Sequence, residues 1–285
     1  MRFLVTGVNG QLGFDIMKEL KKRGYRDITG YDKDDMDLTK EAEVKEKISE
    51  LKPDIVFHCA AYTAVDNAED NMELAHQVNV LGTRYLSEAT KKIDAKLIYI
   101  STDYVFDGEK KYGEIYEVSD KVNPTSVYGR TKYEGELEAL KNPKHFIVRT
   151  SWVFGINGNN FIKTMLRLSE TRNEINVVSD QFGSPTYTVD LARLLVDMAI
   201  TDKYGIYHAN NEGYISWDEF AREIFKQFGK KTTVNSITTD EYPTKAKRPK
   251  NSCLSKKSLD LNGFERLPDW KDAINRYKKE MEENI

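Results

Sequence analysis

The sequence predicts an α/β fold: a Rossmann-type doubly wound parallel sheet with a smaller C-terminal α/β lobe. In the first half, short apolar β-branched runs alternate with longer amphipathic segments. Strands separated by helices in this way need crossover connections, which are right-handed and cover both faces of a parallel sheet. After about residue 151 the alternation becomes looser. We therefore expect the Rossmann domain in residues 1–155, with segments around 175–210 returning to it, and the smaller lobe mainly in residues 156–285.

The elements of the first half follow from apolar runs and from the residues that end them. Gly24 closes the first helix and Pro53 stops the second, as each residue type does at helix ends. The expected strands are 2–7, 27–32, 54–61, 96–101 and 145–151, and the expected helices are 11–24, 40–53, 73–92 and one that begins near Tyr128.

The second half mixes the same two kinds of element. Ser216 with Glu219 three residues later forms a capping-box pattern, which marks the start of a helix. The other expected elements are helices over 159–173, 189–201 and 268–282 and strands over 174–180 and 205–210.

Composition excludes several classes of protein. The net charge of −3 offers no electrostatic basis for binding nucleic acid. Two cysteines without metal-type spacing argue against a disulfide framework and fit a reducing compartment. No run approaches the length of a membrane span, and the apolar run at the start is too short for a signal peptide. We expect a soluble, cytoplasmic protein that binds neither nucleic acid nor membrane.

A glycine-rich turn lies between the first strand and the first helix. In "VTGVNGQLG", Gly7 permits a tight turn, Gly10 lets the backbone approach a pyrophosphate, and Gly13 lets the helix lie close to the sheet. The helix N-terminus, which includes Gln11 and Leu12, offers free N–H groups to phosphates. The position of this glycine-rich turn, after a strand and before a helix, predicts a dinucleotide site.

Asp32 stands at the end of the second strand, where a ribose 2′-hydroxyl would lie. A carboxylate there repels a 2′-phosphate, so NADH is favoured over NADPH, although the neighbouring Lys33 could offset the repulsion. Asp37 and Leu38 are candidates to flank the adenine, but a loop that caps the next helix explains them almost as well.

The third strand ends in "CAAYTAVDNAE", where Ala60, Ala61 and Tyr62 leave room for a ligand at the carboxyl edge of the sheet. Ordinary tight packing is the alternative. Asn79, within the third helix, is either a surface amide or an anchor for the backbone beneath the site.

The fourth strand ends in Thr102, and Tyr128 and Lys132 follow on one face of a helix, one turn apart. A tyrosine titrates near 10 and is a poor acid or base at neutral pH. A lysine ammonium one turn away and a nearby nicotinamide cation would bring its pKa toward the working range. The three residues together predict proton transfer coupled to hydride transfer.

These motifs resemble the extended short-chain dehydrogenase/reductases and, within them, the dTDP-4-dehydrorhamnose reductase family. The narrower resemblance rests on "STDYVFDG", "DQFGSPT" and "RPKNSCL", together with the glycine loop, "AAYTAVDNAE", "NPTSVYGRTKYEGE", "RTSWVFG" and "GNNFIKTML". The motifs run in order from Gly7 to Leu254. The resemblance implies reduction of the 4-keto group of dTDP-4-dehydro-β-L-rhamnose, the last step of dTDP-rhamnose synthesis, which serves polysaccharide biosynthesis.

The resemblance also implies roles for individual residues. Tyr128 would donate the proton, Lys132 would assist it and bond the nicotinamide ribose, and Thr102 would hold the 4-keto oxygen. The substrate contacts would be made by Asp103, Tyr104, Trp152, Asn160 and Arg248. Trp152 could instead be a core aromatic residue, and Arg248 a solvated cation in a basic run. The family suggests a homodimer and, in some members, Mg²⁺, which no spacing here places.

Three other functions share parts of this pattern. A nucleotide-sugar 4,6-dehydratase needs Asp-Glu after the threonine, whereas Asp103 and Tyr104 follow Thr102 here. A 4-epimerase, or a 4-ketoreductase for another nucleotide sugar, needs only the residues present. The regulatory β subunit of methionine adenosyltransferase resembles the same family and acts by binding, but the complete catalytic set disfavours that function.

Overall fold

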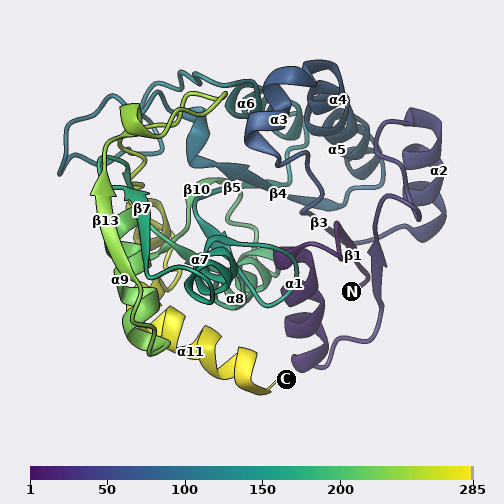
Figure 1. Ribbon diagram of the computed structural model, residues 1–285. Helices are drawn as coiled ribbons and strands as arrows, with labels where there is room; N and C mark the ends of the chain where they lie inside the picture. Colours follow the sequence, from purple (N-terminus) through teal and green to yellow (C-terminus); the bar gives the residue numbers. More distant parts are fainter. Residues whose placement is uncertain (284–285) are drawn as a thin grey trace.

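A six-stranded parallel sheet forms the centre of the computed structural model, which describes residues 1–283 (Figure 1). All its neighbouring strands are parallel, which confirms the predicted fold class. The strand order is β10-β5-β4-β3-β1-β2. The strands are β1 (Phe3–Thr6), β2 (Ile28–Tyr31), β3 (Ile55–His58), β4 (Lys96–Thr102), β5 (His145–Thr150) and β10 (Gly205–His208).

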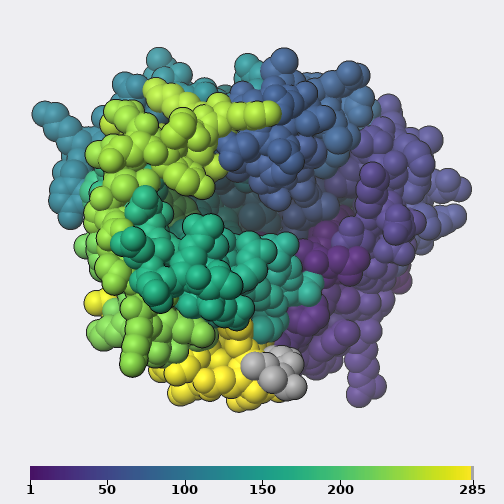
Figure 2. All heavy atoms as spheres, in the orientation of Figure 1, coloured from purple at the N-terminus to yellow at the C-terminus, as the bar shows by residue number. Residues whose placement is uncertain are grey.

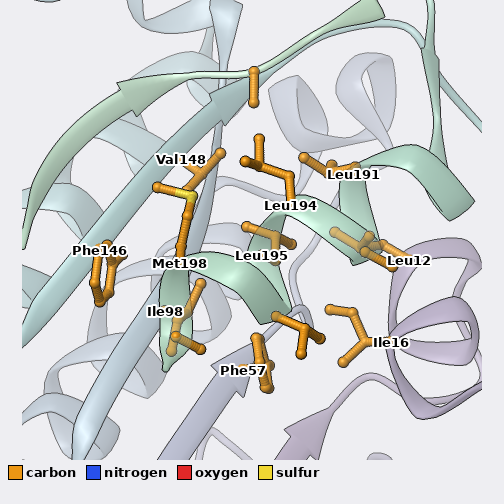
Figure 3. Packing of buried hydrophobic residues seen from close by; sticks show 14 of the residues in the cluster. Leu12, Ile16, Phe57, Ile98, Phe146, Val148, Leu191, Leu194, Leu195 and Met198 are labelled. Atoms are coloured by element: carbon orange, nitrogen blue, oxygen red, sulfur yellow. The ribbon is translucent and has the colours of Figure 1, made fainter. Parts of the chain in front are cut away.

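Successive residues of each strand point to opposite faces of the sheet, so both faces are apolar. In β1, Phe3 and Val5 pack into one core and Leu4 into the other. The first core is covered by α1 (Gln11–Lys22) and α8 (Thr188–Ala199), whose leucines and Ile16 meet Phe57, Ile98 and Val148 (Figure 3). The second core lies under α2 (Glu41–Leu51), α5 (Gly82–Lys92) and α6 (Val127–Ala139).

The segment expected as one helix over 73–92 is divided. It consists of α4 (Met72–His76), the π-helical turn η1 (Gln77–Leu81) and α5, and it follows the short helix α3 (Val65–Asp70). The extra residue of a π turn changes which side chains face the sheet. Here the buried Asn79 points to the loop after β3 and bonds it, a tertiary contact that helical periodicity does not reveal.

The second half builds its own small core. A parallel pair, β7 (Glu174–Val178) and β13 (Thr233–Ile237), packs with α7 (Phe161–Ser169), α9 (Trp217–Gln227) and α11 (Trp270–Glu283). The capping box of Ser216 and Glu219 is confirmed at the start of α9. In the segment 175–210, β10 is a strand of the main sheet and α8 packs on that sheet, whereas β7 pairs with β13.

Short elements connect these parts. The two-stranded pairs are β6 (Val153–Phe154) with β9 (Thr186–Tyr187), β8 (Phe182–Gly183) with β12 (Ile215–Ser216), and β11 (Asn211–Glu212) with β14 (Leu267–Asp269). The remaining helices are the 3₁₀ turns η2 (Asp103–Val105) and η3 (Thr239–Glu241) and the short α10 (Lys257–Leu261). Among residues 1–283, no helix has the length and apolarity that crossing a membrane requires.

The two halves meet across the carboxyl edge of the sheet. In Figure 2 the lime segment of the second half lies against the blue segment of the first, above a hollow. Arg248 donates to Asp66 at 2.7 Å, and Lys245 pairs with Asp70, so this contact is ionic.

Candidate active site

A cavity of about 1030 Å³ opens at the carboxyl ends of β1 to β5, between the two halves. Ligands bind at this edge in open α/β sheets. The walls contain nearly all of the residues expected from the sequence: Gly7, Gly10, Gln11, Leu12, Gly13, Asp32, Asp37, Leu38, Ala60, Ala61, Tyr62, Thr102, Asp103, Tyr104, Tyr128, Lys132 and Trp152. Asn79, Asn160 and Arg248 are not among the lining residues.

The glycine loop is shaped by close backbone contacts. Gly7 has a φ of 71°, and a Cβ there would lie 2.8 Å from the Cα of Ala60. A Cβ on Gly13 would lie 2.2 Å from the carbonyl oxygen of Gly7. Gly10 is the N-cap of α1 and offers no side-chain cap, so the first N–H groups of the helix have no capping side chain, and Gln11, Leu12 and Gly13 line the cavity. A backbone turn that admits no side chain, at a helix N-terminus, fits a pyrophosphate.

Asp32 and Asp37 line the part of the cavity beyond the glycine loop. Asp32 Oδ2 accepts a hydrogen bond from the Asn9 N–H at 3.0 Å, which ties the carboxylate to the loop. The Asp37 carboxylate accepts from the N–H and hydroxyl of Thr39, and these bonds lower the pKa of Asp37. Asp37 therefore closes its own turn as well as lining the cavity.

Asn79 supports the site from behind the cavity wall. Its Oδ1 accepts from the Tyr62 N–H at 2.8 Å, and its Nδ2 donates to the Tyr62 carbonyl at 3.2 Å and to the Thr131 hydroxyl at 3.0 Å. Thr131 precedes Lys132, so one amide fixes both the loop after β3 and the helix that carries Lys132.

Thr102, Tyr128 and Lys132 all line this cavity. Thr102 is the last residue of β4, and the other two lie on the first turns of α6, whose N-cap Ser126 accepts from the Gly129 N–H at 3.1 Å. The Thr102 hydroxyl donates to Asp103 Oδ1 at 2.9 Å.

Burial controls the charges of this set. It raises the pKa of Tyr128 well above its usual value, and Asp103 and Tyr104 raise it further, while a hydrogen bond with Thr102 acts in the opposite direction. Among the protein's own groups, desolvation dominates and raises the Tyr128 pKa. The expected lowering also requires a nicotinamide cation and stays a prediction. Burial also lowers the pKa of Lys132 to about 7, against the attraction of Glu136. Tyr128 keeps its proton at neutral pH, as a proton donor must.

Asp103 and Tyr104 continue the wall from Thr102. Burial raises the pKa of Asp103 to about 6, and its Oδ2 has no hydrogen-bond partner within residues 1–283. The Tyr104 ring lies edge-on to Tyr128 with the centroids 5.6 Å apart. Arg248 donates to the Tyr104 hydroxyl at 2.9 Å, so it contacts a residue of the cavity wall although it does not line the cavity itself.

Trp152 lies on the side of the cavity that faces the second half. Its φ of 47° is left-handed, and its ring stacks on Trp217 with the centroids 3.6 Å apart and the planes 13° apart. A Cβ on Gly183 would lie 2.8 Å from the Trp152 ring. Trp217 also lines the cavity, although the sequence predicts only that it lies at the start of a helix. Its position directly after the N-cap Ser216, and the presence of only three tryptophans, were the available signals.

Asn160 does not line the cavity, and its side chain makes hydrogen bonds inside the fold. Its Oδ1 caps α7 by accepting from the Lys163 N–H, and its Nδ2 donates to Gln11 Oε1 at 3.1 Å. Gln11 in turn accepts from the Gly155 N–H at 2.9 Å. Asn160 thus joins the second half to the glycine loop, rather than facing the wall that Thr102 forms.

The comparisons with known proteins agree on one family. The family model described as the RmlD substrate binding domain matches residues 1–283. A dTDP-4-dehydrorhamnose reductase of Aggregatibacter actinomycetemcomitans is 42% identical over 97% of this chain and 98% of its own. The chain belongs to the dTDP-4-dehydrorhamnose reductase family.

Solved structures of family members are also similar. The dTDP-4-dehydrorhamnose reductase of Clostridium acetobutylicum superposes with a TM-score of 0.96 at 43% identity and covers 99% of this chain and 100% of its own. That of Bacillus anthracis, in complex with NADP, has a TM-score of 0.94 at 44% identity and covers 98% and 99%. A UDP-glucose 4-epimerase of Thermus thermophilus shares the fold at 21% identity.

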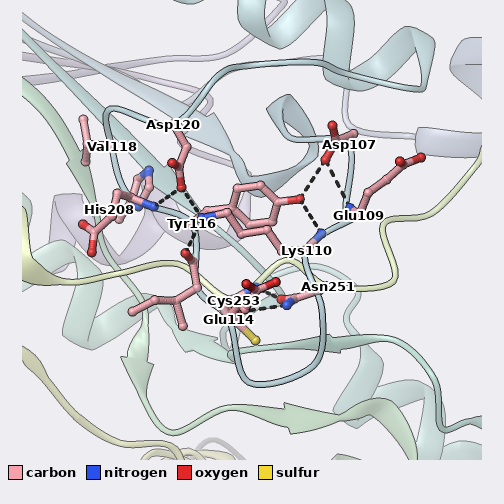
Figure 4. A network of polar contacts seen from close by, with 12 residues as sticks. Asp107, Glu109, Lys110, Glu114, Tyr116, Val118, Asp120, His208, Asn251 and Cys253 are labelled. Atoms are coloured by element: carbon pink, nitrogen blue, oxygen red, sulfur yellow. Dashed lines mark hydrogen bonds and ion pairs between the residues drawn. The ribbon is translucent and has the colours of Figure 1, made fainter.

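Two motifs of this reductase family member are joined by the polar network in Figure 4. The loop after "STDYVFDG" contacts "RPKNSCL" through Asn251, whose Nδ2 donates to the carbonyls of Lys111 and Glu114 at 2.9 and 2.8 Å. The Tyr116 N–H donates to the Cys253 carbonyl at 2.7 Å, and the Tyr116 hydroxyl donates to Asp107 at 2.8 Å. This network holds the segment that carries Arg248 over the first half.

Within residues 1–283, no group of three or more His, Cys, Asp or Glu side chains is arranged to hold a metal ion.

Proposed function

We propose that this chain reduces the 4-keto group of dTDP-4-dehydro-β-L-rhamnose to give dTDP-β-L-rhamnose, with NADH or NADPH as the reductant. The observation that carries the proposal is that Thr102, Tyr128 and Lys132 line the same cavity as the glycine loop. A proton donor thus lies beside a dinucleotide cradle in a member of a family of such reductases.

The glycine loop would hold the pyrophosphate of the nicotinamide cofactor, and Asp32 the adenosine ribose. When bound, the reduced nicotinamide supplies the hydride for C4 of the sugar. Asp32 favours NADH, and the exposed Lys33 on the cavity wall would neutralise a 2′-phosphate and allow NADPH as well.

Tyr128 would donate its proton to the 4-keto oxygen as C4 is reduced. The Thr102 hydroxyl would turn from Asp103 to that oxygen and orient it. Proton loss leaves a phenolate in a buried site, where it is costly, and the cationic form of Lys132 would stabilise this charge. A positioned proton donor of this kind contributes about 10²–10⁴-fold to the rate.

The stacked Trp152 and Trp217 would form the apolar wall for the nucleotide sugar. Asp103 and Tyr104 would border the sugar, and Arg248 would act on the substrate through Tyr104. Asn160 would act through Gln11 on the cofactor loop rather than on the sugar.

The division at about residue 155, with a cofactor-binding first domain and a substrate-binding second lobe, is part of the proposal. A homodimer, a cytoplasmic location and an unplaced Mg²⁺ remain predictions.

The proposal is tested by following oxidation of NADH, and separately of NADPH, with dTDP-4-dehydro-β-L-rhamnose and identifying the sugar product. Consumption of reduced cofactor with formation of dTDP-β-L-rhamnose supports it. Release of a C4 epimer without net consumption would instead assign the chain an epimerase activity. A binding subunit would take up the cofactor and change neither compound.

A further inference from the structure

The ammonium of Lys132 lies against an aromatic ring. The Lys132 side chain is buried, 3% exposed, and its Nζ lies 4.1 Å from the centroid of the Tyr99 ring. An ammonium at this distance over a ring face is attracted by the negative face of the π system, and the attraction is strongest where water is excluded.

Tyr99 is fixed in this position from two sides. It is fully buried in β4, and its hydroxyl donates to the backbone carbonyl of Lys132 itself at 3.1 Å. A Cβ on Gly135, in the next turn of α6, would lie 2.3 Å from the Tyr99 hydroxyl oxygen, so the glycine permits this approach. Ser101, two residues along the same face of β4, donates to Glu136 of α6 at 2.5 Å. The strand therefore binds the helix at both ends of the Lys132 turn.

We propose that Tyr99 is a positioning residue that holds the Lys132 ammonium in place and keeps it charged inside the closed site. The inference rests on the proposed function, because it gives Lys132 a role only if Tyr128 donates a proton there.

The electrostatic surroundings explain why such support is needed. Desolvation is the largest influence on Lys132 and lowers its pKa to about 7. The charged and titratable groups around it are Glu136 and Tyr128 on α6, Tyr99 on β4, and His58 and Cys59 at the end of β3. Glu136 favours the charged lysine, while burial lowers the pKa of His58 to about 3 and keeps it neutral. Burial raises the pKa of Tyr99 well above 10, so its ring stays neutral and electron-rich.

The negative face of the Tyr99 ring favours the protonated form of Lys132. A change that makes this face less negative therefore lowers the pKa of Lys132. Because turnover needs the charged lysine, the alkaline limb of the kcat/KM profile should then move to lower pH.

The test replaces Tyr99→Phe and then fluorinates that ring at one, two and three positions by incorporation of fluorophenylalanines. Fluorine withdraws charge from the ring face and barely changes its size. The alkaline limb should move down progressively, by about 0.5–1 pH unit from phenylalanine to the trifluoro ring, which matches the usual strength of such contacts. The same series at Tyr207, a buried ring in the core on the other face of the sheet, should leave the limb in place.

If the wild type reduces the sugar but the alkaline limb of the kcat/KM profile stays constant across the fluorinated series at position 99, the inference is overturned and the proposed function stays intact. A wild type that binds cofactor and reduces no keto-sugar would overturn both. A thermal melt of each variant, compared with the Tyr207 series, separates a loss of folding from a shift of the limb.

Discussion

A buried ion pair beneath the active site permits a quantitative prediction. Glu136 and Arg149 are 1% and 2% exposed, and Arg149 donates to both carboxylate oxygens, at 2.8 and 2.7 Å. Ser101 adds a third bond to Glu136. These residues join β5 to α6, which carries Lys132, and to β4, which carries Thr102.

Changing Glu136→Gln removes the charge but keeps the shape, and it leaves the Arg149 cation uncompensated in the interior. Breaking a buried pair in this way costs about 3–5 kcal/mol. For a chain of this size the melting temperature should fall by about 6–15 °C. Arg149→Met should cost a similar amount, whereas the double variant Glu136→Met with Arg149→Met should cost less than either single change, because no buried charge is left.

The assay is thermal unfolding followed by circular dichroism, with the exposed Arg2–Asp27 pair as the control. Asp27→Asn should shift the melting temperature by no more than about 2 °C, because exposed pairs contribute little. Single variants at 136 and 149 that melt at the wild-type temperature, or a double variant whose loss equals the sum of both single losses, would show that the buried pair does not stabilise the fold in this way.

Three further predictions concern other parts of the structure. Trp217→Leu should raise the KM for the nucleotide sugar by about 2–10-fold, because Trp152 loses its stacking partner, and it should leave the Kd of NADH unchanged; equal losses for both ligands would count against a substrate wall. Asp15→Asn should stabilise the fold above about pH 6 by on the order of 2–3 kcal/mol and have little effect below about pH 4. The reason is that burial raises the pKa of Asp15 to about 6, so above that pH the folded state contains a buried carboxylate that is costlier than the exposed one of the unfolded state, and asparagine avoids this cost; denaturant titrations at the two pH values check the sign. Lys33→Ala should raise the KM for NADPH more than that for NADH, and an equal change for both cofactors would remove Lys33 from the 2′-phosphate site.

Local spacing predicted much of the cofactor half. The contacts of Gly7 and Gly13 arise within one strand–turn–helix unit, so their roles follow from neighbouring residues. Tyr128 and Lys132 lie one helical turn apart, which sequence also shows. The cavity that unites them with Thr102 follows from the parallel sheet, whose strand ends share one edge.

Contacts between distant segments could not be predicted from the sequence. The π-helical turn that aims Asn79 at Tyr62 depends on tertiary bonds rather than on periodicity. The stacking of Trp217 on Trp152 joins residues 65 positions apart, and Asn160 meets Gln11 across 149 positions. The extent of burial could not be read from the sequence either, and burial is the largest influence on the pKa values of Tyr128 and Lys132.

The Tyr128→Phe variant removes the proton donor proposed for reduction of the 4-keto-sugar and keeps the ring. We expect this variant to bind NADH as the wild type does, while its kcat with dTDP-4-dehydro-β-L-rhamnose falls by about 10²–10⁴-fold. Reduction at the wild-type rate in the phenylalanine variant, with dTDP-β-L-rhamnose as the product, would contradict this role of Tyr128.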